Sequence, residues 1–294
     1  MSLWADIAAQ ISVPTGRPFI VEQASSISGG CINETYRIEG DGQRFFVKLN
    51  NIDSLAMFEA EAAGLQEIHK SRTLRVPLPV CWGTNKSKAW LVLEYLEMDN
   101  VSCGDAAALG LGLAAMHHSS SEKFGWVRDN TIGATPQINK FSSNWIQFWR
   151  EHRLGYQLQL AGTNGHTGKL QTLGDQLLAQ LDCFFPGWEP AVSLLHGDLW
   201  SGNYSFDCAG QPVLFDPAVY YGDRETDIAM TELFGGFSTV FYAAYREAYP
   251  LDTGYATRKT LYNLYHILNH LNLFGGGYLN QAEQMISRLL AETH

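Results

Sequence analysis

The chain has few cysteines, and they do not form a recognisable metal or redox motif. Its 294 residues include five cysteines, and no two of them stand at CxxC spacing. An odd number without that spacing argues against a disulfide framework and against a structural zinc site. We therefore expect a protein of the reducing cytoplasm that folds without cross-links.

Long apolar runs and targeting signals are also lacking. No stretch approaches 18 apolar residues free of charge, so we expect no membrane span and no membrane partner. The opening residues, MSLWADIAAQ, have neither the basic cluster nor the apolar core of a signal peptide. Hydrophobic residues make up 46% and charged residues 17% of the chain, a balance typical of a folded globular protein.

Positive charge is in deficit. The chain carries 20 lysines and arginines against 30 acidic residues, a formal net charge of −10. This balance disfavours nonspecific binding to nucleic acid, which depends on neutralising phosphates. It still permits an anionic ligand that is held by backbone amides and a metal. Either a monomer or a homodimer is compatible with these properties.

The pattern of predicted elements divides the chain into a β-rich part and a helical part. In the first part a hairpin turn is expected at residues 40–42 and a helix at 53–69. Strands are predicted to begin at residue 19 and to span 32–38, 44–49 and 90–96. In the second part a helix capped by Ser102 and Asp105 comes first, and further helices are expected at 143–160, 168–184, 226–248, 257–274 and 278–292. Only 192–216 should interrupt them with short strands. We predict an α+β fold with two lobes, residues 1–96 and 97–294.

Most of the functional information lies in residues 196–216, which read HGDLWSGNYSFDCAGQPVLFD. A hairpin of two short strands would bring Asn203 and Asp216 to one edge, where both can face a metal. Mg²⁺ favours such hard oxygen ligands. Asp198 would then remain to accept the proton of an attacking hydroxyl. Each residue alone could be a simple turn residue, but their combined spacing predicts phosphoryl transfer.

Two further features could hold phosphates. Gly29 and Gly30 lie in a loop of small residues between predicted strands, where backbone amides can approach phosphates closely. The loop matches neither GxxxxGK[ST] nor GxGxxG, so a plain hairpin is the alternative. Lys48 lies late in an apolar strand, where an ion pair together with a phosphate contact would explain it; the alternative is a lysine that reaches solvent from an edge strand. Glu61 is its expected partner, with Glu59 as second candidate.

Other motifs are weaker. The strand ending at residue 96 joins the two lobes, and a purine could use backbone groups of Glu94 and Leu96 there. Residues 110–115 fit GxGxxA, but they lie in an Ala/Leu-rich helical run without a preceding strand, which predicts close helix packing. His266 and His270 stand at i, i+4 without an accompanying carboxylate. We interpret them as core or groove histidines.

Taken together, these parts resemble the eukaryotic-protein-kinase-like fold. HGDLWSGN followed by FDPAVYYGDRETDIAM is similar to the fructosamine kinase (ketosamine-3-kinase) family. The similarity extends over nearly the whole chain, through GGCINETYRI, FVKLN, MFEAEAAGL, LVLEYL, FGWVRDNTIG and the Gln137-Ile138-Asn139 that follows. Aminoglycoside and choline phosphotransferases share the HGD…N…D skeleton but usually lack Trp200 and the DPAVYYGDRE continuation.

The resemblance implies a kinase that uses ATP and Mg²⁺, with residues 1–96 as the ATP-binding lobe and 97–294 as the catalytic and substrate-binding lobe. It implies the following roles: catalytic base for Asp198, metal ligands for Asn203 and Asp216, a phosphate-positioning ion pair for Lys48 and Glu61, and support of the catalytic loop for Asp227. The implied reaction is phosphorylation of the sugar 3-hydroxyl of ketosamines, such as ribulosamine or fructosamine adducts on proteins or amines, which releases the adduct. One alternative is a small-molecule phosphotransferase of the aminoglycoside or choline kinase type. Another is a nucleotide-binding pseudokinase, although no required side chain is missing.

Two residues carry separate hypotheses. Trp200 lies two positions from Asp198, so its ring could pack on a sugar or attract an amine cation; the alternative is a core tryptophan under the loop. Cys31 lies in the predicted phosphate loop, where oxidation or a disulfide between two copies would couple activity to redox state. The alternative for Cys31 is a small, buried and inert side chain.

Overall fold

The computed structural model describes residues 2–27, 32–99 and 104–293. The chain packs into two compact units, Met1–Asp105 with Ser205–Pro217 and Ala106–Tyr204 with Ala218–His294. The first is built mainly on a β-sheet and the second mainly on helices, so the predicted α+β class is confirmed. No helix in the described part of the chain has the length and hydropathy needed to cross a membrane.

One segment of the helical half of the sequence packs with the first unit. Strand β10 (Tyr204–Asp207) pairs with β6 (Met98–Asp99), and β11 (Pro212–Leu214) pairs with β10. Arg75 adds an ion pair of 2.9 Å to Asp207, and its carbonyl accepts the Leu214 N–H at 2.9 Å. Packing therefore assigns residues 205–217 to the first unit. The division of roles at residues 96 and 97 stays a prediction.

The first unit contains a five-stranded antiparallel sheet of order β1-β2-β3-β5-β4. Its strands are β1 (Gln23–Ser26), β2 (Glu34–Gly40), β3 (Gln43–Asn51), β4 (Pro79–Thr84) and β5 (Lys88–Glu94). The predicted hairpin turn is confirmed, since Asp41 and Gly42 have φ of 49° and 71°, as a two-residue type I′ turn requires. The strand start predicted at residue 19 is wrong: Gln23 pairs with Glu39 near the end of β2, so residues 19–21 have no strand to pair with.

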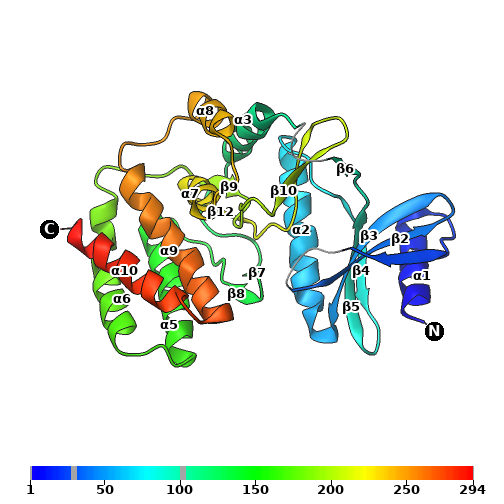
Figure 1. Cartoon of the computed structure of the whole chain (residues 1–294), viewed down its shortest axis with the longest axis horizontal. Helices are drawn as coiled ribbons and strands as arrows, with labels where there is room; N and C mark the ends of the chain where they lie inside the picture. Colours follow the sequence, from blue (N-terminus) through cyan, green and yellow to red (C-terminus); the bar gives the residue numbers. More distant parts are fainter. Residues whose placement is uncertain (1, 28–31, 100–103, 294) are drawn as a thin grey trace. The chain divides into compact units, whose positions relative to one another are not determined.

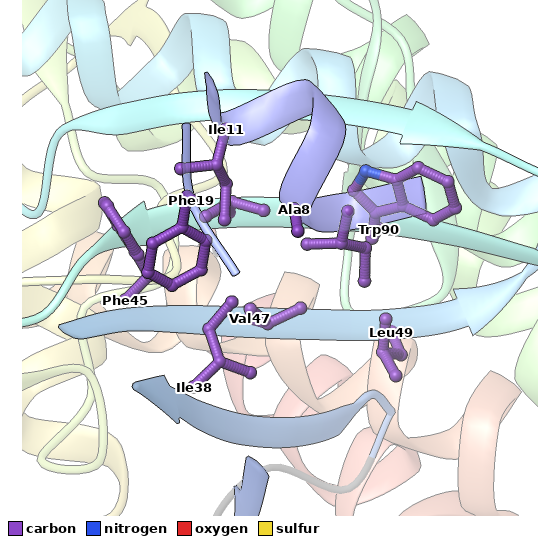
Figure 2. Close-up of a cluster of buried hydrophobic side chains, with 10 residues drawn as sticks. Ala8, Ile11, Phe19, Ile38, Phe45, Val47, Leu49 and Trp90 are labelled. Carbon is purple, nitrogen blue, oxygen red and sulfur yellow. The ribbon is translucent and has the colours of Figure 1, made fainter. Parts of the chain in front are cut away.

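Helices cover both faces of this sheet (Figure 1). Helix α1 (Leu3–Thr15) lies on one face, and α2 (Leu55–Ser71), preceded by the short η1 (Ile52–Ser54), lies on the other. Figure 2 shows the cluster under α1, made of Ile7, Ala8, Ile11, Phe19, Ile38, Phe45, Val47, Leu49, Trp90 and Val92. The sequence analysis missed α1, although its apolar residues 7, 8 and 11 follow helical spacing.

The second unit is a bundle of helices. They are α3 (Ala106–His117), α4 (Trp145–Trp149), the π-helical η3 (Arg150–Leu154), α5 (Gly155–Thr163), α6 (Lys169–Ala179), the 3₁₀ turn η4 (Leu181–Phe184), α7 (Glu225–Leu233), α8 (Thr239–Ala248), α9 (Tyr255–Phe274) and α10 (Tyr278–Ala291). Helix α9 packs on α5, α7 and α10, and α3 packs on α8. A Cβ on Gly110 would lie 2.5 Å from the Phe241 carbonyl, so the GxGxxA segment does serve close helix packing.

Two details of this unit differ from the sequence-based expectation. The single helix predicted over 226–248 is broken, because Gly235 and Gly236 adopt left-handed φ of 73° and 96°. Among the described residues, three strands of this unit lie outside 192–216: β12 (Tyr220–Gly222), which pairs with β9 (Ser193–Leu195) inside that range, and β7 (Asn130–Ile132), which pairs with β8 (Thr135–Gln137). Three-residue strands are too short to show an alternating pattern.

Candidate active site

Lys48 lies between two carboxylates in the first unit. Its Nζ donates to Glu61 Oε1 at 2.6 Å, the ion pair that the sequence predicts, and also pairs with Asp216. The Lys48 side chain is 4% exposed and the Glu61 side chain 11%, so their ion pair forms away from solvent. Burial by itself would lower the pKa of Lys48, but attraction to Asp216 and Glu61 outweighs it and raises the pKa. The ammonium therefore stays charged at neutral pH.

The alternation of β3 explains why Lys48 points to this place. Val47 and Leu49 belong to the cluster under α1, so Lys48 between them faces the opposite side of the sheet, where α2 carries Glu61. Asp216 reaches the lysine from a backbone φ of 56°, a left-handed value that is uncommon outside glycine. Its side chain is 46% exposed, so the carboxylate also meets solvent. The sequence analysis did not predict contact between Lys48 and Asp216.

The strand end at Glu94 offers fewer backbone groups than expected. Its N–H donates to the Leu78 carbonyl at 2.9 Å, and its carboxylate accepts the Leu78 N–H at 3.1 Å. A purine could therefore use only the carbonyl of Glu94. The Leu96 N–H makes no hydrogen bond to any residue that the structure describes, so it is available as a donor. The residues of the predicted phosphate loop, Gly29, Gly30 and Cys31, lie outside the described residues.

Asp198 and Asn203 are bonded to each other within the second unit. The Asn203 Nδ2 donates to the Asp198 carbonyl at 2.9 Å and to Asp198 Oδ2 at 3.3 Å. Because both partners can only accept, the nitrogen of the amide must face Asp198. Its oxygen then points elsewhere, and no described residue donates to it. This leaves one hard oxygen atom next to the predicted base.

Asp227 holds the backbone of this loop. Its carboxylate accepts the His196 N–H at 2.7 Å and the Gly197 N–H at 2.9 Å, and it contacts His117 Nε2 at 3.2 Å. Burial by itself would raise the pKa of Asp227, but the hydrogen bond from His117 and its other donors lower it. Gly197 has a φ of 82°, and a Cβ there would lie 2.1 Å from the Ala218 carbonyl oxygen. The loop can take this path only with glycine at 197.

A buried chain of side chains continues behind Asp227. Arg224 Nη1 donates to the Tyr245 hydroxyl at 3.0 Å, which in turn lies 2.8 Å from His117 Nδ1. Burial lowers the pKa of His117, so the ring is neutral. With Nδ1 accepting from Tyr245, Nε2 carries the proton that is donated to Asp227. The sequence analysis missed His117 and Tyr245, because a polar residue on a helix gives no signal of such pairing.

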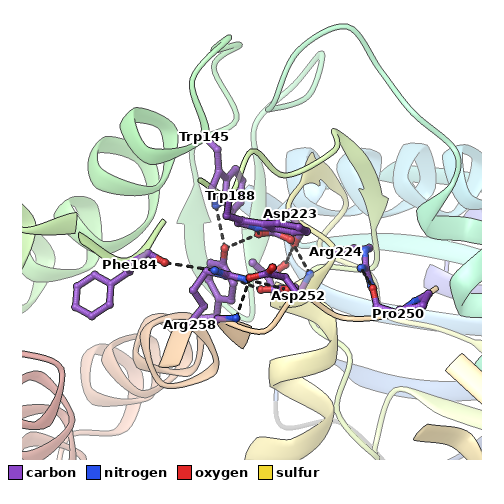
Figure 3. Close-up of polar contacts among 12 residues, drawn as sticks. Trp145, Phe184, Trp188, Asp223, Arg224, Pro250, Asp252 and Arg258 are labelled. Carbon is purple, nitrogen blue, oxygen red and sulfur yellow. Dashed lines mark hydrogen bonds and ion pairs between the residues drawn. The ribbon is translucent and has the colours of Figure 1, made fainter. Parts of the chain in front are cut away.

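The segment Asp223-Arg224-Glu225 anchors the start of α7, which carries Asp227 (Figure 3). Asp223 Oδ2 accepts from Trp188 Nε1 at 3.1 Å and from the Tyr262 hydroxyl at 2.7 Å. Glu225 forms a buried ion pair of 2.7 Å with Arg258. Burial raises the pKa of Glu225 to about 7, in spite of that arginine. These contacts explain the GDRE part of the sequence motif: its side chains fix the start of α7, and α7 carries the Asp227 that holds the loop at residues 196–197.

Trp200 is a surface residue of the loop. Its side chain is 40% exposed, which contradicts the alternative of a core tryptophan. The ring lies over the backbone at Gly202, where a Cβ would come within 2.2 Å of it. An indole held in this way offers a ring face to solvent two residues from Asp198. Its contact with an acceptor stays a prediction.

The paired histidines do not form a metal site with neighbouring side chains. His266 is buried, and burial lowers its pKa to about 3. The His270 ring donates from Nδ1 to the His266 carbonyl at 2.7 Å, so it serves a helical contact. In the described ranges no three side chains of His, Cys, Asp or Glu gather as metal ligands.

A family model and several similar proteins point to the same protein family. The family model described as "Fructosamine kinase" matches residues 3–292. A "Probable ketoamine kinase" of Synechocystis sp. is 48% identical over 292 residues, covering 98% of this chain and 97% of that protein. A chloroplastic "Protein-ribulosamine 3-kinase" of Oryza sativa subsp. japonica is 40% identical over 292 residues, covering 98% of this chain and 85% of that protein.

Solved structures agree with the sequence comparisons. A "Putative fructosamine-3-kinase" from Haemophilus somnus superposes with a TM-score of 0.89 at 29% identity, covering 98% of this chain and 100% of that one. An aminoglycoside phosphotransferase has a TM-score of 0.63 at 15% identity, covering 97% and 98% of the two chains. The second likeness shows the shared kinase-like fold alone.

Proposed function

Because this chain belongs to the fructosamine kinase family, we propose that it transfers a phosphoryl group from ATP to the sugar 3-hydroxyl of a ketosamine. Ribulosamine and fructosamine adducts, free or bound to protein, are the acceptors that the names of its relatives favour. The observation that carries the reaction class is the loop in which Asn203 orients Asp198 while Asp227 holds the backbone.

Asp198 acts as the catalytic base. Its carboxylate accepts the proton of the acceptor hydroxyl as that oxygen attacks the γ-phosphorus, and ADP leaves. General-base assistance contributes about 10²–10⁴-fold to such a step. The hydrogen bond from Asn203 Nδ2 to Oδ2, at 3.3 Å, restricts the rotation of the carboxylate and so fixes the direction in which it accepts the proton.

Asn203 and Asp216 are suited to bind Mg²⁺. The Asn203 amide oxygen has no donor among the described residues, and Asp216 offers a partly exposed carboxylate. Both are hard oxygen ligands, and Mg²⁺ commonly takes only one or two protein ligands besides phosphates and water. When bound, the ion neutralises charge on the phosphates. Lys48, positioned by Glu61, supplies a second positive charge to the nucleotide.

The nucleotide base would bind at the end of β5. The Leu96 N–H is available to donate a hydrogen bond, and the Glu94 carbonyl can accept one. This pairing of one donor with one acceptor matches the edge of adenine. These assignments give residues 1–96 the ATP-binding role and the remaining residues the catalytic and acceptor-binding roles.

The test is Mg²⁺-dependent ATP turnover against ribulose-lysine, fructose-lysine, kanamycin and choline. We expect turnover with the two ketosamines. Turnover with kanamycin or choline alone would refute the acceptor assignment, and ATP binding without any turnover would indicate a pseudokinase. Asp198→Asn should lower kcat by about 10²–10⁴-fold. The nucleotide affinity of Asp198→Asn should stay unchanged, because Asp198 does not hold ATP.

A further inference from the structure

Four aromatic rings gather at one place on the second unit, and we name them the His270 cluster. His270 is at the centre, with Phe234 at 5.2 Å, Phe274 at 5.6 Å and Tyr278 at 5.2 Å between ring centroids. They come from the end of α7, the end of α9 and the start of α10 (Figure 1). Phe234 is 45% exposed and Phe274 is 59% exposed, so the cluster presents aromatic surface to solvent.

The central ring also provides one polar atom. The His270 Nδ1 donates to the His266 carbonyl at 2.7 Å. In the neutral ring Nε2 is therefore a hydrogen-bond acceptor. No residue in the described part of the chain donates to it. The cluster thus combines apolar ring faces with one acceptor nitrogen.

One member of the cluster, Phe234, lies two residues from a backbone segment that contacts the loop carrying Asp198. The Gly236 carbonyl, two residues after Phe234, accepts the Tyr204 hydroxyl at 3.0 Å. A Cβ on Gly236 would lie 2.4 Å from the Ser201 Cβ, so the two backbones are in close contact. Ser201 follows the exposed Trp200. A ligand extending from the loop across residues 234–236 would therefore meet the His270 cluster.

The chemistry of the cluster suits a cation. Aromatic faces attract ammonium groups, and an acceptor nitrogen can take an N–H. The protein's own cations do not occupy these faces, since among described residues the arginines placed over aromatic rings lie on other rings. The net charge of −10 also favours cationic ligands.

We propose that the His270 cluster is the subsite for the protonated amine that joins the sugar of a ketosamine to its carrier. This rests on the proposed function, and it adds which part of the acceptor the cluster recognises. The rings receive the ammonium by cation–π attraction, and His270 Nε2 accepts one of its N–H groups. The cluster would then distinguish amine-linked sugars from neutral sugars, while Asp198 acts on the hydroxyl.

Phe274→Ala tests the subsite, because this exposed ring can be removed without opening the core. The acceptors are ribulose-lysine and its N-acetylated form, in which the linking nitrogen carries no charge. Loss of one cation–π contact should raise KM for ribulose-lysine about 2–30-fold. The Kd for the N-acetylated form and the KM for ATP should stay within about twofold. Phe274→Tyr keeps a ring and should behave as the wild type.

Phe141→Ala is the matched control, since Phe141 is also an exposed phenylalanine of the second unit, at 56%. It should leave all constants unchanged. An unchanged KM in Phe274→Ala, or equal losses for the charged and neutral compounds, overturns the subsite. A wild-type protein that phosphorylates no ketosamine overturns the proposed function instead. The two failures are therefore distinguishable, and thermal unfolding of each variant shows that it is folded.

Discussion

Asp227→Asn is the most informative single change, because it alters the support of the loop that carries the proposed base without changing Asp198 itself. The carboxylate accepts from the His196 N–H, the Gly197 N–H and His117 at 2.7, 2.9 and 3.2 Å. Asparagine has nearly the same shape, but one of its two terminal atoms is a donor. At least one of the buried N–H groups would then face an NH₂ group and lose its partner.

The size of the effect follows from that single lost partner. An unsatisfied buried donor costs about 1–3 kcal/mol, and the lost charge weakens the remaining hydrogen bonds. We expect Asp227→Asn to lower the free energy of unfolding by roughly this amount. We also expect kcat to fall about 10²-fold, since a displacement of about 1 Å of a catalytic group can cost that much. The KM for ATP should change little, because Lys48 and Asp216 belong to the other unit.

The assay combines urea unfolding with steady-state kinetics. Asp182→Asn is the control, because this carboxylate is 71% exposed and pairs only with Arg150 among the described residues. Its loss should cost less than about 1 kcal/mol. The folded pKa of Asp227 lies below its usual value, so its stabilising effect is present above pH 4 and is lost as the pH falls further. A variant with normal kcat and normal stability would refute the support that we assign to Asp227.

Three other variants test separate parts of the reasoning. Lys48→Met leaves Glu61 and Asp216 without their cation and should lower kcat/KM for ATP by at least about 10²-fold; kinetics within tenfold of wild type would exclude a phosphate-positioning role. Buried neutral His266 has a folded pKa of about 3, below its unfolded value near 6.5, so its contribution to stability is complete above pH 6.5 and is lost as the pH falls. Between pH 7.5 and 5.5 the free energy of unfolding measured in urea should fall by roughly 1.4 kcal/mol because of this histidine. In His266→Leu the free energy of unfolding should fall by that much less than in the wild type. Equal decreases in the two proteins would contradict a neutral histidine. Trp200→Ala should raise the acceptor KM about 2–30-fold at constant KM for ATP, and unchanged acceptor kinetics would remove Trp200 from the binding site.

Several parts of the fold and of the site were predictable because local spacing encodes them. The hairpin turn at residues 40–42 needs residues that tolerate positive φ, and the sequence supplies Asp41 and Gly42. The period of the helix 55–71 puts Glu61 on the buried face, and the alternation of β3 points Lys48 toward it. These patterns act over a few residues, so they can be read without knowing what packs against them.

Other elements escaped prediction because their stability comes from packing. Helix α1 is held by the cluster around Trp90 rather than by a strong sequence signal. The short strands β7 and β12 exist through their partners, since three residues cannot show a period. The helix predicted over 226–248 ends early because Gly235 and Gly236 adopt left-handed φ, which the apolar pattern of this segment did not indicate.

The sequence by itself determined the chemistry that we propose for this protein, since Asp198, Asn203 and Asp216 stand at a spacing that permits a base and a metal. Only the tertiary structure decided what surrounds them. Lys48 pairs with Asp216 across 168 positions, and His117 reaches Asp227 across 110. Residues so far apart meet because whole elements pack together. The same packing leaves Trp200 and the His270 cluster at the surface, and solvent exposure cannot be inferred from residue type alone.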